Sequence, residues 1–95
     1  MRVHFTDNAR RQLRAIHDYI AQNSTRYARR MVDRIIRRSE HLATFPHSGW
    51  IVPEYEDGEI REVVEATYRI IYRVRSEQVD ILAVIHGARQ LPRTI

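Results

Sequence analysis

The sequence predicts an α+β fold in which one twisted, mainly antiparallel sheet carries an antiparallel helical hairpin on one face. Between residues 7 and 44, apolar residues recur every three or four positions, which is the period of a helix with one buried side. Between residues 60 and 85 they recur at every second position, in runs separated by short polar turns, as in a β-meander. A length of 95 residues is sufficient for one domain with one modest hydrophobic core.

The N-terminal third predicts a strand followed by a helix. In residues 2–6, polar and apolar side chains alternate, which places Val3 and Phe5 on one face of a strand. Thr6 and Asp7 both carry the side-chain oxygen that an N-cap requires, and the helix extends to about Gln22. Its apolar residues form one narrow stripe, made of Ala9, Leu13, Ile16 and Ile20.

A second helix is predicted from about Arg26 to Thr44, after a break at residues 23–25. The short connection favours an antiparallel pair of helices. The side opposite its apolar face carries arginines, namely Arg26, Arg30, Arg34, Arg37 and Arg38. Their simplest interpretation is a solvated face whose aliphatic stems cover apolar neighbours.

The C-terminal half predicts the meander. Residues 50–52 form a short strand, which Pro53 restricts to an edge of the sheet or to its own end. Residues 60–64 and 68–75 are predicted to form a β-hairpin, and residues 79–85 the last strand.

The alternation within these strands predicts which side chains share a face. In residues 68–75, one face is expected to hold Tyr68, Ile70, Tyr72 and Val74, and the other Arg69, Ile71, Arg73 and Arg75. In the last strand one face is expected to hold Val79, Ile81, Ala83 and Ile85, and the other Leu82 and Val84, which predicts a central, doubly covered position. We expect the core between hairpin and sheet to include Ile16, Ile20, Ile35, Tyr72 and Ile81.

Composition and charge limit the classes of protein to which this chain can belong. All sixteen basic residues are arginine, and the formal net charge is +4. Residues 54–65 alone carry a charge of −5, between a region of +6 before them and a region of +3 after them. The chain has no cysteine, which excludes disulfides, thiolate metal sites and cysteine nucleophiles. No signal-peptide or membrane-span pattern is present, so a cytoplasmic protein is expected.

The candidate site is a set of basic side chains on the last strands. The five histidines show no metal-ligand spacing, and no nucleophile elbow or glycine-rich phosphate loop occurs, so we expect neither a metal nor a cofactor. One group remains, namely Arg61, Arg69, Arg73, His86 and Arg89. Clustered arginines beside a titratable histidine suit phosphate binding, proton transfer at an RNA 2′-OH, or docking on an acidic protein surface. Alternatively, Arg61 and Arg69 form structural ion pairs with Glu62, Glu65 or the acidic loop.

Several segments together resemble one family. They are Leu42 with Pro46-x-x-Gly49, Ile60-Arg61-Glu62, the run from Tyr68 to Val74, and the run from Val79 through His86-Gly87-x-Arg89. This combination resembles the RelE/ParE superfamily of type II toxins over almost the whole chain, and it is most similar to the ParE branch, also called plasmid stabilization proteins. The resemblance implies a small bacterial toxin that arrests growth. It further implies a cognate antitoxin with a DNA-binding head and an acidic, disordered segment that folds on the toxin, which we expect to reach Arg69 and Arg73.

The two branches of this superfamily imply different targets. RelE-like members cleave mRNA on the ribosome, using basic sheet residues and commonly a C-terminal Tyr or His. Carried over, the resemblance gives Arg69 and Arg89 such roles, and the lysines of that branch are missing, since Arg61 is the only basic residue on the preceding strand. Independently of the resemblance, His86 is the one residue of the candidate group that could carry a proton. The usual C-terminal Tyr falls at about Ile95, which cannot polarise a hydroxyl. ParE-like members inhibit DNA gyrase, and we expect this function; a ribosome-dependent endoribonuclease is the alternative, and a degenerate domain that only binds its antitoxin is a third.

Overall fold

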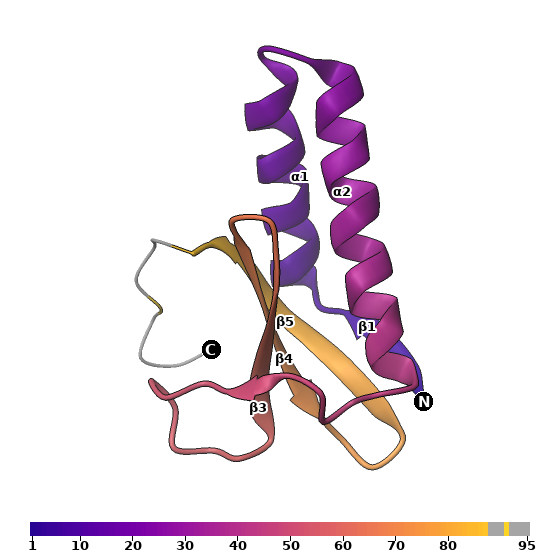
Figure 1. The fold of residues 1–95 in the computed structure, drawn as a ribbon, viewed down its shortest axis with the longest axis vertical. Helices are drawn as coiled ribbons and strands as arrows, with labels where there is room; N and C mark the ends of the chain where they lie inside the picture. Colours follow the sequence, from indigo (N-terminus) through magenta and orange to yellow (C-terminus); the bar gives the residue numbers. More distant parts are fainter. Residues whose placement is uncertain (88–90, 92–95) are drawn as a thin grey trace.

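A computed structural model describes residues 1–87 and Leu91, and it confirms the α+β fold predicted from the sequence. Two helices lie side by side, and their lower halves pack on a twisted five-stranded sheet (Figure 1). The elements in chain order are β1 (Arg2–Phe5), α1 (Asp7–Ala21), α2 (Thr25–Glu40), a 3₁₀ turn (His41–Ala43), β2 (Trp50–Ile51), β3 (Ile60–Glu65), β4 (Tyr68–Val74) and β5 (Gln78–His86).

The sheet has the order β1-β5-β4-β3-β2. β1 pairs with β5 in parallel, whereas the other neighbouring strands are antiparallel. The upper half of the hairpin, including the turn between α1 and α2, extends beyond the sheet (Figure 1). Side chains in that half therefore have no strand beneath them, and this exposes surfaces that a simple two-layer arrangement would bury.

Both helices begin at the capping residues that their sequences provide. The Thr6 side chain accepts a hydrogen bond from the backbone N–H of Ala9, and the Ser24 side chain accepts one from Tyr27. α2 ends at Glu40, four residues earlier than the sequence indicated, and the chain continues as the 3₁₀ turn. Helix ends commonly tighten in this way, because the last carbonyls lack regular partners, and here Pro46 follows closely.

The main core lies between the hairpin and the sheet. Ile35, Tyr72 and Ile81 are fully buried there, as predicted. Ile16 and Ile20 pack against the same cluster but remain partly exposed. The reason is their position on α1, toward the end of the hairpin that extends beyond the sheet (Figure 1).

A β-bulge corrects the expected face assignment in β5. Ile71 pairs with Ala83, but the next residue, Tyr72, pairs with Ile81, so Leu82 is an additional residue in the strand. After the bulge the alternation is inverted. Val84 joins the helix-facing core with Val79 and Ile81, whereas Ala83 and Ile85 lie on the opposite face. The strict alternation predicted across residues 79–85 was therefore wrong, because one inserted residue exchanges the two faces.

Polar side chains of α1 bind the edge of β5 beyond the end of β1. The Asn8 amide donates to the Leu82 carbonyl (2.9 Å), and the backbone N–H of Val84 donates to Gln12 Oε1 (2.8 Å). These contacts give partners to backbone groups that β1 does not reach. They also fix where the first helix crosses the sheet.

The second face of the sheet is also covered. Val52 and Tyr55, from the segment between β2 and β3, pack with Ile60, Ile71 and residues of β5. Leu91 joins this smaller cluster. β5 is thus buried on both faces, as its apolar residues predicted.

Candidate functional site

The sheet divides the predicted basic group into two parts. Arg61 pairs directly opposite Tyr72, and His86 pairs opposite Tyr68, so both belong to the helix-facing side. Arg69 and Arg73 alternate with Tyr72 along β4 and project to the other side. Arg89 lies outside the described residues. The four described members therefore do not meet at one point.

Arg69 is held in a network of carboxylates. Its Nε donates to Glu62 Oε1 (3.1 Å), its Nη2 pairs with the other oxygen of Glu62, and its Nη1 contacts Glu54 Oε2 (3.3 Å). Arg69 and Glu62 are only 15% and 14% exposed. The hydrogen bonds to Glu62 raise the pKa of Arg69 further above its usual value, against the opposing effect of burial. This arrangement is the structural ion pair that the sequence left as an alternative.

Arg73 is bound by the same acidic segment. Its Nη1 donates to Asp57 Oδ2 (2.7 Å), and Asp57 also accepts a hydrogen bond from the backbone N–H of Glu59 (3.0 Å). The bond from Glu59, together with the one from Arg73, lowers the pKa of Asp57. The acidic strip at residues 54–65 thus neutralises the arginines on this face of the sheet.

Arg61 fastens the loop before β2 to the sheet. Its Nη1 donates to the carbonyls of Gly49 (3.0 Å) and His47 (3.4 Å). The Gly49 N–H donates in turn to the Tyr72 hydroxyl (3.0 Å), and a Cβ at Gly49 would lie 2.5 Å from the Glu62 carbonyl. Burial raises the pKa of Tyr72, which keeps this hydroxyl neutral. Glycine is required here because the chain approaches the sheet so closely.

Charge is distributed unevenly between the two halves of the molecule. Residues 7–40, which contain both helices, carry nine arginines and four acids, a charge of +5. Residues 41–87 carry four arginines and eight acids, a charge of −4. Where the halves meet, Arg34 of α2 pairs with Glu65 of β3 (2.6 Å). The positive field of the molecule is therefore concentrated on the hairpin.

A groove of about 460 Å³ lies between α1 and the ends of β4 and β5. Ile16, Tyr19, Tyr68 and His86 line it, with Gln12 at its base. Tyr19 is 71% exposed, and the rings of Tyr68 and His86 meet edge to face at 5.9 Å. Burial, and then the neighbouring Tyr27 and Tyr19, raise the pKa of Tyr68. The groove thus combines apolar and aromatic surface with a titratable ring, which is the composition of a protein-docking site.

Only His86 of this groove was among the predicted site residues. Tyr68 was assigned to the core, and Tyr19 carried no site signal beyond its place near the end of the first helix. The exposure of a large aromatic residue on a helix next to its apolar stripe is the signal that sequence alone offered. The groove itself depends on how far the hairpin extends past the sheet.

Other kinds of site receive no support from the part of the chain that the structure describes. Within residues 1–87 and Leu91, no group of three or more His, Asp or Glu side chains is arranged to hold a metal ion. The helices in the same ranges are too short or too polar to cross a membrane.

Solved structures share this architecture. One belongs to a chromosomal ParDE TA system from P. aeruginosa, with a TM-score of 0.74, 22% identity, and coverage of 90% of this chain and 95% of that one. Another is part of the toxin–antitoxin complex RelBE2 from Mycobacterium tuberculosis, with a TM-score of 0.67, 25% identity, and coverage of 93% and 92%. No curated protein sequence matches this chain closely enough to count as a relative.

The molecule therefore has the fold of the ParE/RelE class of proteins. Within that class, the chain belongs to the family described as the ParE toxin of the type II toxin–antitoxin system parDE, whose model matches residues 3–91. The resemblance seen in the sequence is confirmed.

Proposed function

We propose that this toxin inhibits DNA gyrase by binding to it. Membership of the ParE family supports this function. The main observation against RNA cleavage is that the sheet separates the basic side chains from one another. Arg69 and Arg73 lie on the opposite face of the sheet from His86, and both are bound by carboxylates of the chain itself.

A ribonuclease needs these groups to converge. The attacking 2′-OH, the scissile phosphate and the leaving oxygen must all lie within hydrogen-bond reach of proton carriers and cations. Here Arg61 is bound to loop carbonyls, and Arg69 is bound to Glu62. Inhibition by docking requires no such convergence, so a protein target fits the arrangement better than ribosome-bound mRNA does.

We expect the purified toxin to block supercoiling by gyrase while translation in a purified extract continues. His86→Ala should retain supercoiling inhibition, apart from any loss caused by weaker docking or lower stability. The measurement compares supercoiled product and cleaved mRNA at equal toxin concentrations. Codon-position cleavage of mRNA on programmed ribosomes, lost in Arg69→Ala or His86→Ala, would instead establish the nuclease.

We propose that the antitoxin partner docks in the groove beside α1. The groove supplies apolar and aromatic surface, and the adjoining hairpin is strongly positive. An acidic segment with apolar side chains, ordered on binding, complements both properties. His86 would contact it directly, whereas Arg69 and Arg73 project from the opposite face of the sheet and are bound by Glu62 and Asp57, so a segment in the groove would not reach them. Such a pair of proteins would act in the cytoplasm.

Replacing Tyr19 with Ala should weaken the antitoxin complex about tenfold or more, because an exposed aromatic residue at the rim of an apolar groove is a typical binding hot spot. Trp50→Ala is the matched control. Trp50 is 80% exposed on β2, at the far edge of the sheet from α1. Co-purification and titration with the cognate antitoxin, once its gene has been identified beside that of the toxin, measure the effect. A complex weakened by Trp50→Ala and indifferent to Tyr19→Ala would place the antitoxin elsewhere.

A further inference from the structure

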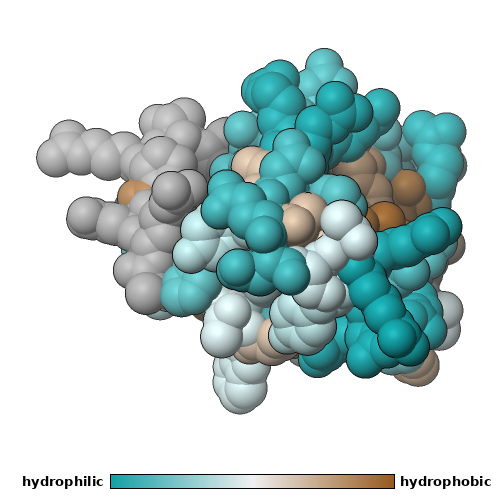
Figure 2. Space-filling model, turned by 90° about the horizontal axis from the view of Figure 1, so that it is seen from above, coloured by the Kyte–Doolittle hydropathy of each residue, from teal (hydrophilic) through white to brown (hydrophobic). Residues whose placement is uncertain are grey.

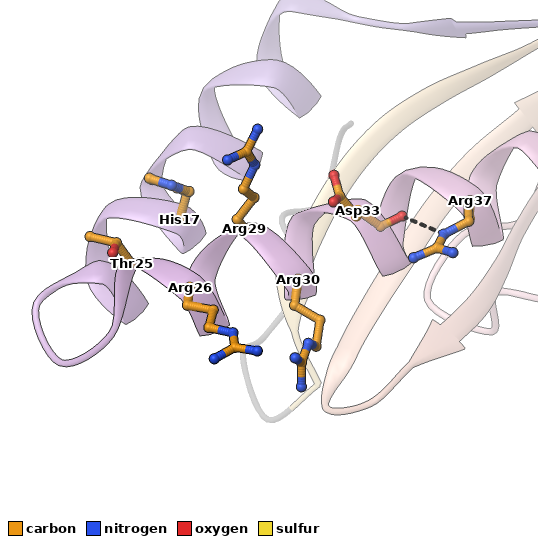
Figure 3. A pocket seen from close by; sticks show the side chains of 7 residues that line it. All are labelled: His17, Thr25, Arg26, Arg29, Arg30, Asp33 and Arg37. Atoms are coloured by element: carbon orange, nitrogen blue, oxygen red, sulfur yellow. Dashed lines mark hydrogen bonds between the residues drawn. The ribbon is translucent and has the colours of Figure 1, made fainter.

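A second surface on the hairpin is built almost entirely from arginine. Arg26, Arg29, Arg30 and Arg37 lie within about 100° of one another around α2, on its solvent side. With His17 of α1 and Asp33 they line a shallow depression of about 790 Å³. Figure 3 shows Arg26 and Arg30 pointing the same way from successive turns, while Arg29 projects from another side of the helix beside His17.

These arginines differ from those of the sheet in forming no ion pair in the part of the chain that the structure describes, although the single carboxylate of Asp33 lies in the same depression. Within the described residues, the guanidiniums of Arg26, Arg29 and Arg30 form no ion pair, while Arg69, Arg73 and Arg75 each bind a carboxylate. Arg37 donates only to the backbone carbonyl of Asp33 (3.5 Å) (Figure 3). The net positive charge of the molecule is thus exposed here and available to a ligand.

The position of these charges is unfavourable for the helix itself. Arg26, Arg29 and Arg30 follow the N-cap Ser24 closely, and the first turn contains no acidic residue. The N-terminal end of a helix carries partial positive charge, and cations three or four residues apart repel one another. At Arg26, in the first turn, an acidic residue would make the helix more stable, whereas Arg29 and Arg30 stand four and three residues before Asp33, which offsets part of their repulsion. A local arrangement that lowers stability is expected where a surface serves binding.

We propose that this arginine surface binds the phosphate backbone of duplex DNA without reading its sequence. From Arg26 to Arg37 the row spans about 16 Å of helix, a length over which duplex DNA carries roughly ten phosphate charges. Each guanidinium offers a planar fork that matches two phosphate oxygens. DNA bound here would add to whatever contact the chain makes with a protein target, through a surface separate from the groove.

The composition of the surface favours phosphate over an acidic protein segment. A protein segment that orders on binding needs apolar area to bury. Among the described residues, those that line the depression are arginines with one His, one Thr and one Asp, and none is an aliphatic or aromatic hydrocarbon side chain. Seen from above, hydrophilic residues dominate the visible face, and the apolar patches between them are small (Figure 2). The groove on the other side of α1 offers that apolar area instead. Phosphate binding requires only the charges.

The test measures DNA affinity directly, with the full chain and without gyrase or antitoxin, so it can fail independently of the proposed toxin function. The probe is a labelled duplex of unrelated sequence, about 20 base pairs long, titrated at several salt concentrations and followed by fluorescence anisotropy. We expect binding that weakens steeply with salt. Arg26→Glu with Arg29→Glu should lower affinity by about 50-fold at 0.1 M salt and reduce the slope of log K against log salt by about 2.

The matched control removes the same charge elsewhere. Arg2→Glu with Arg10→Glu changes two exposed arginines, in β1 and in the first turn of α1, to acids at the end of the hairpin opposite to Arg26 and Arg29, and it should alter DNA affinity by less than about fivefold, because screening limits distant charges. If both double variants lost the same DNA affinity, the loss would follow from the lower net charge alone, and the proposal would be overturned. So would failure of the unaltered chain to bind at low salt.

Two further measurements distinguish a DNA site from a folding defect and from a site for another polyanion. The thermal midpoint of the Arg26→Glu, Arg29→Glu variant should stay within a few degrees of that of the unaltered chain, because an acid at position 26 suits the first turn of the helix whereas an acid at position 29 faces Asp33 one turn later. If that variant unfolds, Arg30→Gln with Arg37→Gln tests the same surface without reversed charge. An RNA duplex that binds as well as DNA supports a backbone-phosphate site, whereas exclusive binding of RNA, or displacement by polyglutamate at equal charge, overturns the assignment to DNA.

Discussion

Replacing Ile35 with Ala is expected to lower the free energy of unfolding by about 3 to 4 kcal/mol. Ile35 is fully buried where α2 meets the sheet, in the same cluster as Tyr72 and Ile81. The substitution removes buried hydrocarbon and leaves a cavity that its close-packed neighbours fill only in part. For a domain of this size the thermal midpoint should fall by about 12 to 30 °C.

Ile51→Ala provides the control for this prediction. The chemical change is identical, but Ile51 is 53% exposed on the edge strand β2, so its loss should cost less than about 1 kcal/mol. Chemical denaturation of both variants gives the two free energies. Similar values would show that the helix-facing side of α2 has been assigned incorrectly.

Replacing Arg69 with Ala is expected to destabilise the fold by about 2 to 3 kcal/mol, mainly by isolating Glu62. The Glu62 carboxylate is 14% exposed and receives two hydrogen bonds from the Arg69 guanidinium. Without that guanidinium, a largely buried negative charge lacks its counter-ion. Glu54, the other partner of Arg69, is 43% exposed and can be solvated by water.

Two variants separate the effect of an isolated charge from a simple loss of packing. Arg73→Ala removes a more exposed pair, since Asp57 is 39% exposed, and should destabilise the fold much less than Arg69→Ala does. The double variant Arg69→Leu, Glu62→Leu leaves no isolated charge and should recover most of the stability lost in Arg69→Ala. If the double variant were less stable than Arg69→Ala, the isolated carboxylate would not be the cause. Urea unfolding of all three proteins decides the question.

The ion pair also shows why the candidate site could be predicted only in part. The sequence identified Arg69 as a strand residue with a charged side chain, and it offered both phosphate binding and pairing with Glu62 as roles. The two residues lie seven positions apart, on opposite strands of a hairpin. Whether Arg69 and Glu62 meet depends on the register in which the two strands pair, and the turn at Ala66 sets that register. The register cannot be deduced from the number of residues between them.

Local chemistry and periodic burial were sufficient to predict the order of elements, both helix N-caps, the deeply buried Ile35, Tyr72 and Ile81, and the family. Each segment carries these signals in its own residues, so they can be read without knowing how the segments meet. The excess of arginine on the outer side of α2 was visible in the same way, though only as a solvated face.

Which side chains share a surface depended instead on how the segments pack. The bulge at Leu82 inverts the second half of β5 and so places Val84 beside α1. The sheet separates His86 from Arg69, and the projecting hairpin creates the groove at Tyr19 and Tyr68. The acidic segment neutralises the arginines of β4 and pairs with Arg34, but among the described residues it leaves Arg26, Arg29 and Arg30 of α2 without an ion pair. Each of these facts depends on contacts between residues distant in the chain, which no local pattern encodes.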